Sequence, residues 1–564
     1  MSTNISKQKR DDLVVKIETI RKAIEASSAD ENKGNLLTYL GELEREIQGK
    51  KYGLVFEEHR EELDDILETN TPIMDEQKEL FIDNGGQMNF LIEGDNLACL
   101  KLLEKTHKGK IDLIYIDPPY NNGGEAFVYD TNMVDELDNY KHSKWISFMK
   151  QRLLLAKNLL SEKGCIMMSI SDIEFANLRL LSNSIFGEHN FIGEFVVVVA
   201  PNARDYGHIG KMHEYALFYA KNIEKLATNK LFVVDKKFKY KDALGGFNIH
   251  PLYNSNEAFH KENRPNLYYP FYLNPKADKN GFCELSLDLK DNWIEVYPPL
   301  SLKNSVQFVW RWGQTKAKKY LNIEIIGYKM SDTEYRVVQK MRHTEKIIRS
   351  VLDDKEYITR KGTAELEEIF SSKIFNFPKA IKLIKDFCEV ATTKKSTILD
   401  FFAGSGTTGH AVMKLNAEDG GNRKFILCTN NENNICRDIT YERIKKVIEK
   451  EEYNASLKYY KVDFVEISEQ MYYEYADELL RHIRELVELE NGVNFVGNDK
   501  IAIVLDDDEL DFFINNDTQL KKCKTLYLGH NVLPSSAQDE VLKANKIKIN
   551  IIPDYYYQEL EMGK

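Results

Sequence analysis

The sequence predicts an α/β protein built on a largely parallel, Rossmann-like sheet that a second unit interrupts. From about residue 88, apolar runs and helical patterns alternate along the chain, as in βαβ units. The apolar runs are continuous rather than alternating, which is typical of strands buried on both faces of a sheet. This rhythm stops near residue 226 and resumes near residue 370, so we expect an insertion there.

Composition places the chain among ordinary globular proteins. It has 564 residues, of which 43% are hydrophobic and 29% charged, enough for several domains. No run approaches the length of a membrane span, and the polar start lacks a signal-peptide core, so no membrane association is expected. The seven cysteines form no CxxC pair, which disfavours a zinc ribbon or a disulfide framework and favours a cytoplasmic protein.

The first segment, residues 1–75, is predicted to be helical. Two stripes of aliphatic residues recur at helical spacing, on either side of the polar stretch SADENKGN. The stripes consist of Leu13, Ile17, Ile20 and Ile24, and of Leu36, Leu40, Leu43 and Ile47. We favour a helix pair packed on its own domain over a contact for a partner chain, because each stripe covers few heptads.

Residues 76–225 and 370–455 contain the predicted sheet. In the first part, the strand NFLIEG is followed by a helix and by the very apolar strand KIDLIYID, and in the second part STILDFF and KFILCTN are strands. Residues 226–369 are rich in Tyr, Asn, Pro and Lys, and residues 456–564 read as a small C-terminal α/β domain. Within the insertion, Lys303–Arg349 holds 11 basic and four acidic residues, so a local basic surface accompanies an overall charge of −12.

The first motif with chemical meaning is Asp117-Pro118-Pro119-Tyr120, directly after the apolar strand. Ligand sites of open α/β sheets lie at such carboxyl ends. Two prolines withhold their N–H groups, so the carbonyls there are rigid acceptors. Asp117 and the Pro118 carbonyl would each accept one N–H of a weakly nucleophilic adenine amino group, and the ring of Tyr120 would stack on the base. The alternative is a strand that ends in a tight turn capped by Asp117.

The second motif, DFFAGSGTTG over Asp400–Gly409, follows the apolar run TIL. Its glycines allow a sharp strand-to-helix turn whose helix N-terminus favours an anionic group. Read alone, the motif is a GxGxxG that would equally suit a nicotinamide or flavin cofactor. A P-loop is excluded, because His410-Ala411 stand where a Lys and a Ser or Thr are required.

Together the motifs resemble those of β-group amino DNA methyltransferases, in which a DPPY block precedes the FxGxG block and a target-recognition domain lies between them. The closer resemblance is to the modification (Mod) subunits of type III restriction–modification systems, over roughly residues 85–455. It rests on LIEGDNLACLKLL, LIYIDPPYNNGG, FVYD, HSKWISFMKQRL, SISDIE, HEYALFYAK, VWRWGQTK, KIFNFPKAIKLI, LDFFAGSGTTGHAV and NRKFILCTNNEN.

The resemblance implies a prokaryotic, cytoplasmic enzyme that methylates adenine N6 in double-stranded DNA, with S-adenosylmethionine as cofactor and no metal. It also implies a Rossmann-like methyltransferase sheet with an inserted target-recognition domain (residues 226–369), a flipped target base, a homodimer, and a separate restriction (nuclease–helicase) subunit as partner. The chain itself lacks a helicase or nuclease signature.

The resemblance also assigns site residues. The catalytic group is Asp117, Pro118, Pro119 and Tyr120. Cofactor contacts are Asp95 at the adenine, Glu432 at the ribose, Asp400 and Gly404 at the amino-acid end, Phe377, Pro378 and Lys379 at the carboxylate, and further Phe402, Gly406 and Thr407. The chain departs from many relatives at Ala380, where they have Pro or Ser, which weakens the assignment of Lys379. DNA contacts are Tyr215 at the base, and Arg311, Arg336, Lys340 and Arg342.

Several alternatives remain open. Tyr215 can equally be a core residue, Trp310 and its neighbours a buried turn, and the basic residues a solvated face. Cytosine N4 is a second possible target, although Asp117 favours adenine because N4 enzymes more often carry Ser at that position. A scaffold that reads DNA for a nuclease partner is a rival from another class, whereas a nicotinamide oxidoreductase leaves the DPPY motif unexplained. An RNA or protein-amide methyltransferase would usually show an NPPY pattern.

Overall fold

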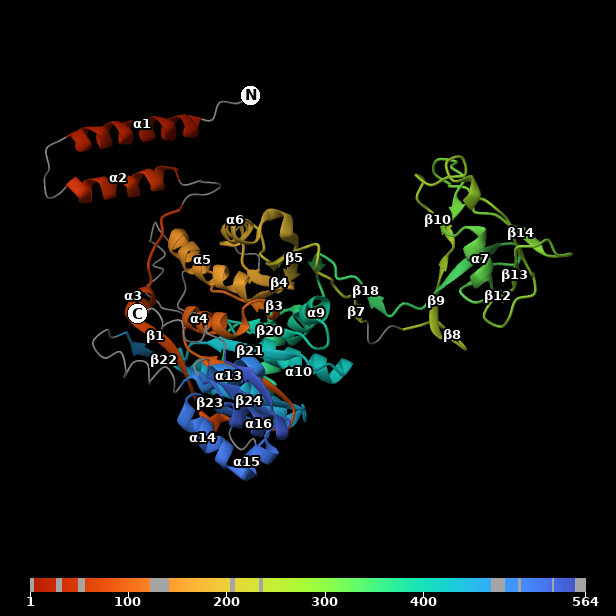
Figure 1. The fold of residues 1–564 in the computed structure, drawn as a ribbon. Coiled ribbons are helices and arrows are strands. Elements are labelled where there is room, and N and C mark those ends of the chain that lie inside the picture. The colour runs from red at the N-terminus through yellow and green to blue at the C-terminus, as the bar shows by residue number, and fades with distance from the viewer. Residues whose placement is uncertain are drawn as a thin grey trace. The chain divides into compact units, whose positions relative to one another are not determined.

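The computed structural model describes residues 5–26, 33–48, 56–121, 141–202, 208–232, 237–467, 482–495, 499–529 and 532–552 (Figure 1). The segment FVYD and the start of the helical pattern after residue 474 lie outside these ranges. The chain divides into two compact units, one formed by residues 1–228 and 349–564 and the other by residues 229–348. Each unit is described by itself.

The first unit is built on a ten-stranded mixed sheet, which confirms the predicted α/β class. In spatial order its strands are β1 (Asn70–Glu76), β22 (Ala455–Glu466), β2 (Gln87–Glu93), β21 (Lys424–Thr429), β20 (Thr397–Asp400), β3 (Ile111–Ile116), β4 (Leu160–Ile170), β6 (His213–Ala220), β5 (Phe191–Val198) and β19 (Val351–Leu352). The run from β22 to β4 is parallel. The strand β6 is antiparallel to both β4 and β5.

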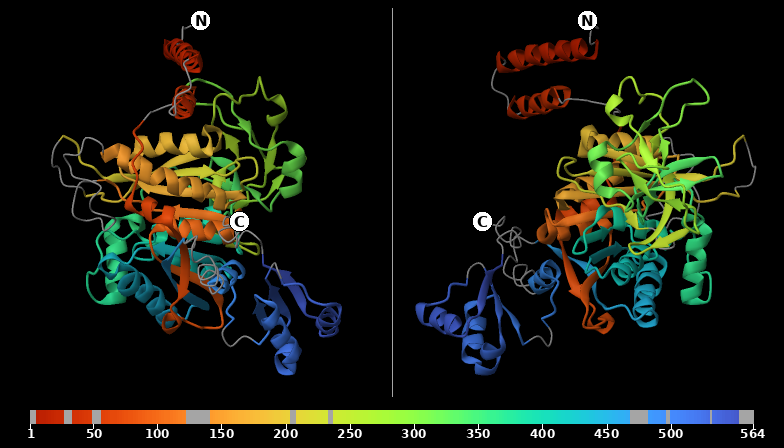
Figure 2. Two further views of the ribbon diagram at one scale, coloured as in Figure 1. Left: turned by 60° about the vertical axis from the view of Figure 1, so that its left-hand side comes forward. Right: turned by 90° about the vertical axis from the view of Figure 1, so that its right-hand side faces the viewer.

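Helices cover both faces of this sheet (Figure 2). They are α3 (Glu62–Thr69), α4 (Asn96–His107), α5 (Lys141–Leu159), α6 (Phe175–Phe186), α8 (Thr359–Phe370), α9 (Ile381–Ala391), α10 (Thr407–Asp419) and α11 (Glu442–Lys450). Alternate residues of β3 point to opposite faces. Ile114 and Ile116 pack in the core with α4, α5 and α6, whereas the ring of Tyr115 faces Phe387 of α9 at 6.2 Å. Burial on both faces explains why this strand is apolar throughout.

The two motif strands are neighbours. β20 pairs in parallel with β3, with Ile398 opposite Leu113 and Leu399 opposite Ile114. Parallel strands present their carboxyl ends at the same edge, so the turns after Ile116 and after Asp400 open side by side. Two motifs that are far apart in the sequence therefore share one edge of the sheet.

Three domain boundaries differ from those predicted. β1 and β22 pair with each other over seven residue pairs and complete the large sheet, although the sequence placed them in the N-terminal and C-terminal segments. β19 and α8 follow the inserted unit and belong to the first unit, because β19 pairs with β5. Local composition does not reveal such pairings, since a strand is assigned to a sheet by partners distant in the chain.

The second unit, residues 229–348, consists of short antiparallel strands and one helix. Its elements are β7 (Leu231–Phe232), β8 (Tyr240–Asp242), β9 (Gly245–Pro251), β10 (Tyr253–Asn254), β11 (Phe271–Leu273), β12 (Phe282–Cys283), β13 (Leu285–Ser286), β14 (Ile294–Val296), β15 (Val309–Trp310), α7 (Gln314–Tyr320), β16 (Ile325–Lys329), β17 (Tyr335–Met341) and β18 (Glu345–Lys346). Trp310 is buried in its core, and its indole N–H donates to the Tyr269 carbonyl at 2.7 Å. Trp310 is therefore buried, as its buried-turn interpretation expected, although it lies in strand β15 rather than in a turn.

The remaining elements of the first unit lie near the chain ends. They are α1 (Ile5–Ala26), α2 (Lys33–Gln48), α13 (Ile483–Asn491), β23 (Ile501–Val504), α14 (Asp507–Asn515), α15 (Asp517–Lys522), β24 (Thr525–Leu528), α16 (Ser536–Ala544) and β25 (Lys548–Ile551). The pair α1 and α2 confirms the predicted helices, and β23, β24 and β25 form a small parallel sheet. Asp506 caps α14, since its side chain accepts from the Glu509 N–H. Within the described ranges, no helix is both long and apolar enough to span a bilayer.

Candidate active site

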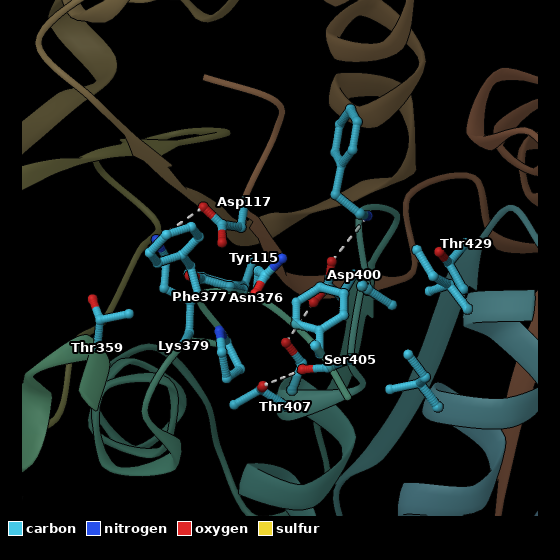
Figure 3. A pocket seen from close by; sticks show the side chains of 18 of the residues that line it. Tyr115, Asp117, Thr359, Asn376, Phe377, Lys379, Asp400, Ser405, Thr407 and Thr429 are labelled. Atoms are coloured by element: carbon cyan, nitrogen blue, oxygen red, sulfur yellow. Dashed lines mark hydrogen bonds and ion pairs between the residues drawn. The ribbon is translucent and has the colours of Figure 1, made fainter. Parts of the chain in front are cut away.

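A cavity of about 500 Å³ opens at the carboxyl edge of β3 and β20 (Figure 3). The turn after β3, the β20–α10 turn, the end of β21 and the segment before α9 all line it. Asp117 and Asp400, from the two predicted motifs, both face this cavity. Its volume lies within the range of small-molecule sites in proteins.

Asp117 and Tyr120 belong to a compact charged network. The Lys379 ammonium lies 3.2 Å from Asp117 Oδ1 and 2.8 Å from Glu214 Oε1. The Tyr120 hydroxyl donates to Glu214 Oε2 at 3.0 Å, and Lys379 Nζ donates to the same hydroxyl at 2.5 Å. Burial raises the pKa of the Glu214 carboxyl, although Lys379 opposes the shift. Burial alone would lower the pKa of Lys379, yet the two carboxylates raise it.

The second proline of this turn is held by a neighbouring helix. The indole N–H of Trp145, on α5, donates to the Pro119 carbonyl at 2.7 Å. No residue of the described chain donates to the Pro118 carbonyl, so that oxygen keeps its acceptor capacity. Pro118 is not among the residues that line the cavity, so its role as a rigid acceptor beside Asp117 stays a prediction.

The Gly-rich turn is built around Asp400. Its Oδ1 accepts from the Phe402 N–H at 3.0 Å and its Oδ2 from the Thr408 hydroxyl at 2.5 Å. Burial raises the pKa of the Asp400 carboxyl to about 7, although these two hydrogen bonds lower it. Gly404 and Gly406 have φ angles of 48° and 75°, a region that side chains with a Cβ rarely adopt. The φ angles at these two positions of the strand-to-helix turn therefore favour glycine.

Arg443, which was not predicted as a site residue, stabilises the Gly-rich turn. Arg443 of α11 is fully buried, and its Nη1 donates to the Ser405 carbonyl, the Ser405 hydroxyl and the Thr407 hydroxyl at 3.2, 3.0 and 2.8 Å. Burial lowers the pKa of this guanidinium to about 10. The feature of the sequence that could have identified Arg443 is a charged residue on the apolar face of α11.

Six of the residues predicted for the catalytic group, the cofactor or the base do not line the cavity: Pro118, Pro119, Gly406, Asp95, Glu432 and Tyr215. Asp95 caps α4 by accepting from the Leu97 N–H at 2.6 Å. Glu432 begins the short helix η6 (Glu432–Asn434), in which Asn433 reaches the cavity instead. The ring of Tyr215 packs against Phe175 with centroids 4.3 Å apart, as its core interpretation predicts. Phe377, Lys379, Phe402, Gly404 and Thr407 do line the cavity.

The four basic residues predicted to contact DNA lie in the second unit and differ in exposure. Lys340 is buried and pairs with Asp242 at 2.8 Å, and Arg342 pairs with the same carboxylate at 2.6 Å. Arg336 pairs with Glu334 at 2.7 Å and is partly exposed. Arg311 is exposed and contacts His250 Nδ1 at 3.2 Å. Lys340 and Arg342 thus form ion pairs within their own unit. The sequence pattern alone did not distinguish such residues from residues on a phosphate-binding surface.

The comparisons with known proteins agree with this site. A family model described as DNA methylase matches residues 111–442, which contain both motifs and the inserted unit. The chain belongs to this DNA methylase family. Type II methyltransferase M.KpnI of Klebsiella pneumoniae is 34% identical over 369 residues, covering 64% of this chain and 84% of that protein.

Two further relatives of this DNA methylase are Mod subunits of type III restriction–modification enzymes. The EcoPI subunit of Escherichia phage P1 is 31% identical over 61% of this chain, and the StyLTI subunit of Salmonella typhimurium is 30% identical over 66%. The matched region spans 58% of each of these longer subunits. Among solved structures, the PvuII cytosine-N4-specific DNA methyltransferase covers 66% of the chain at 11% identity, with a TM-score of 0.33. The fold assignment therefore rests on the strand order rather than on that likeness.

The cofactor that the family implies is S-adenosylmethionine, and the cavity residues fit it. The buried Asp400 carboxylate suits the cofactor's ammonium, because a cation would stabilise its charged form. The amide and hydroxyl donors at the N-terminus of α10 suit a carboxylate, and Asn430 and Asn433 suit ribose hydroxyls. Phe377 and Ile439 offer apolar walls for an adenine ring.

Proposed function

We propose that this DNA methylase transfers the methyl group of S-adenosylmethionine to adenine N6 in double-stranded DNA. The observation that carries the proposal is the pairing of β3 with β20. It brings the rigid acceptors Asp117 and Pro118 next to the turn that fits the cofactor. A methyl donor and an amino acceptor can then meet in one cavity.

The chain's own residues position the amino group. Asp117 and the Pro118 carbonyl each accept one N6–H bond, which draws the nitrogen toward a tetrahedral geometry and directs its lone pair into the cavity. Tyr120, whose hydroxyl is held by Glu214, offers a ring face on which a flipped base stacks. When bound, the cofactor supplies an electrophilic methyl group whose bond to sulfur breaks as the bond to nitrogen forms.

Adenine is proposed over cytosine N4 because the first motif position is Asp117 rather than Ser, and because two relatives are type III Mod subunits. By the same relationship, we propose that the chain is the modification and DNA-recognition subunit of a type III-like restriction–modification system. The partner would be a restriction subunit, and the Mod-like subunit would form a homodimer. The unit at residues 229–348 is the candidate for reading the DNA site, with Arg311 as one of its exposed cations.

A second role, as a recognition scaffold for a nuclease–helicase partner, is compatible with the first. It is favoured by the two relatives that are subunits of type III restriction–modification enzymes. A scaffold alone would not require two acceptors beside a cofactor cavity, so methyl transfer is the primary proposal.

The test is nucleoside mass spectrometry of DNA incubated with the protein and S-adenosylmethionine labelled in its methyl group. We expect label in N6-methyladenine, and sequencing of the product would then map the recognised site. Label in N4-methylcytosine would retain the enzyme class and overturn the proposed base. Bound cofactor without label in any base would favour the scaffold role.

A further inference from the structure

The ammonium of Lys379 stands between two carboxylates, and this position conflicts with the role proposed for one of them. Asp117 Oδ1 is buried and lies 3.2 Å from Lys379 Nζ, so the ammonium occupies one of the two oxygens with which Asp117 could accept the amino group of the base. An ammonium and an incoming N6–H compete for the same lone pairs. Lys379 must therefore have another partner when the base enters, because an unpaired buried charge is costly.

Glu214 provides that partner. Its two oxygens lie 2.8 and 3.0 Å from Lys379 Nζ, both closer than Asp117 Oδ1. We propose that Glu214 is a positioning residue that retains the Lys379 ammonium when the target base binds, so that Asp117 is free to accept N6–H. The inference rests on the proposed function and adds to it a residue that neither motif contains.

The two partners differ in how they are anchored, which supports this assignment. Glu214 lies within β6, where it pairs with Val197 of β5. Its side chain is buried and accepts from the Tyr120 hydroxyl at 3.0 Å. Lys379 lies outside regular structure, immediately before the Ala380 cap of α9, and has a long flexible side chain. Because the Glu214 carboxylate is fixed and the Lys379 side chain is flexible, the ammonium can move a short distance away from Asp117 and stay paired with Glu214.

The charges around Lys379 lead to a pH-dependent test. The ionisable groups in contact with it are Asp117, Glu214 and Tyr120, and Tyr115 and Asp400 lie near enough to act on them electrostatically. Burial lowers the pKa of Lys379, and the two carboxylates more than offset this effect. If Glu214 loses its charge, only Asp117 remains to stabilise the ammonium. The pKa of Lys379 then falls, and while Lys379 stays protonated it pairs with Asp117 alone.

The experiment compares Glu214→Gln with the matched control Glu194→Gln. Glu194 lies on the adjacent strand β5, is exposed, and does not line the cavity. Single-turnover methyl transfer would be measured across the alkaline pH range, together with cofactor affinity by calorimetry. We expect Glu214→Gln to slow transfer about tenfold or more near neutral pH, with cofactor affinity within about twofold. Its rate should rise with pH as Lys379 deprotonates, whereas the control should follow the wild type.

Two further variants keep the proposal testable if Glu214→Gln folds poorly. Glu214→Asp, which preserves the charge, should restore much of the rate. The double variant Glu214→Gln/Lys379→Met, which removes the competing ammonium, should be faster than Glu214→Gln alone. A wild-type rate and pH profile in Glu214→Gln, or a double variant no faster than the single one, would overturn the inference. A wild-type protein without any methyl transfer would instead overturn the proposed function on which the inference rests.

Discussion

Lys379 Nζ lies 3.2 Å from Asp117 Oδ1, so a residue expected to hold the cofactor contacts the proposed catalytic carboxylate instead. The two residues are far apart in the sequence. They are in contact because the segment before α9 lies next to the end of β3. Lys379 also lines the cofactor cavity. The Lys379 ammonium therefore pairs with Asp117 in this structure. It could contact the cofactor carboxylate only if its ion pair with Asp117 rearranged.

Asp117→Asn should abolish most methyl transfer and leave cofactor binding largely unchanged. The amide keeps the shape of the side chain but replaces one acceptor oxygen by a donor, and loses the charge that pairs with Lys379. We expect the rate to fall on the order of a hundredfold or more. Calorimetric titration with S-adenosylmethionine would check binding. A variant of near wild-type activity would contradict the role of Asp117.

Gly404→Val should weaken cofactor binding, because φ at this position is 48° and a β-branched residue is strained there. The matched control is Gly420→Val, at the other end of α10, where φ is 66° and a Cβ would meet no atom within 4 Å. Both changes should cost about 1–2 kcal/mol of stability. Only Gly404→Val should also reduce cofactor affinity, by about tenfold or more. Equal affinities in the two variants would contradict the assignment of this turn.

The stability of the first unit should depend on the ionisation of Asp400. Burial raises its pKa from 3.8 to about 7, so the folded state disfavours the charged form. The contribution of this group is therefore complete below its unfolded pKa of 3.8 and is lost as pH rises through about 7. Asp400→Asn should flatten this dependence in denaturant titrations. If the free energy of unfolding of Asp400→Asn changed with pH as steeply as that of the wild type between pH 3.8 and about 7, Asp400 would not titrate in this range.

Cofactor affinity should follow the opposite trend. Because the cofactor's ammonium prefers an ionised Asp400, binding by the wild type should tighten as pH rises through about 7. Calorimetry at several pH values would measure this, and Asp400→Asn should bind more weakly with little pH dependence. A pH-independent wild-type affinity would argue against an ammonium contact at Asp400.

In the second unit, Asp242→Asn should destabilise the fold. Asp242 accepts from both Lys340 and Arg342, and the Arg342 hydrogen bond lowers the pKa of its carboxyl. This stability is present above the unfolded pKa and is lost as pH falls, so the loss in the variant should be largest near neutral pH. We expect a loss of about 1–3 kcal/mol, since the change removes the carboxylate that pairs with the buried Lys340 ammonium and leaves Arg342 paired with Glu324 alone.

The matched control for Asp242 is Asp332→Asn. Asp332 also pairs with a cation, Lys329, at 2.7 Å, but its side chain is 96% exposed. Because exposed ion pairs contribute little, no measurable change in stability is expected. If the two variants behaved alike, the network around Asp242 would not stabilise this unit as proposed.

The α/β class, the two motifs and the inserted unit could be predicted from the sequence alone. These features depend on local patterns: apolar runs, glycines at a sharp turn, and prolines after a strand. The same patterns did not distinguish Lys340 and Arg342, which pair within the fold, from the exposed Arg311.

Only the tertiary structure decided which side chains meet. Glu214 lies in the segment HEYALFYAK and is the only acidic residue of an apolar strand. This isolated acidic residue was the feature of the sequence that could have identified it as a site residue. Its partner Lys379 is 165 residues away in the chain, and Tyr120 is 259 residues from the same lysine. Hydrogen bonds and ion pairs depend on distance in space, so a contact across such separations is set by the order of strands in the sheet and is absent from any local pattern.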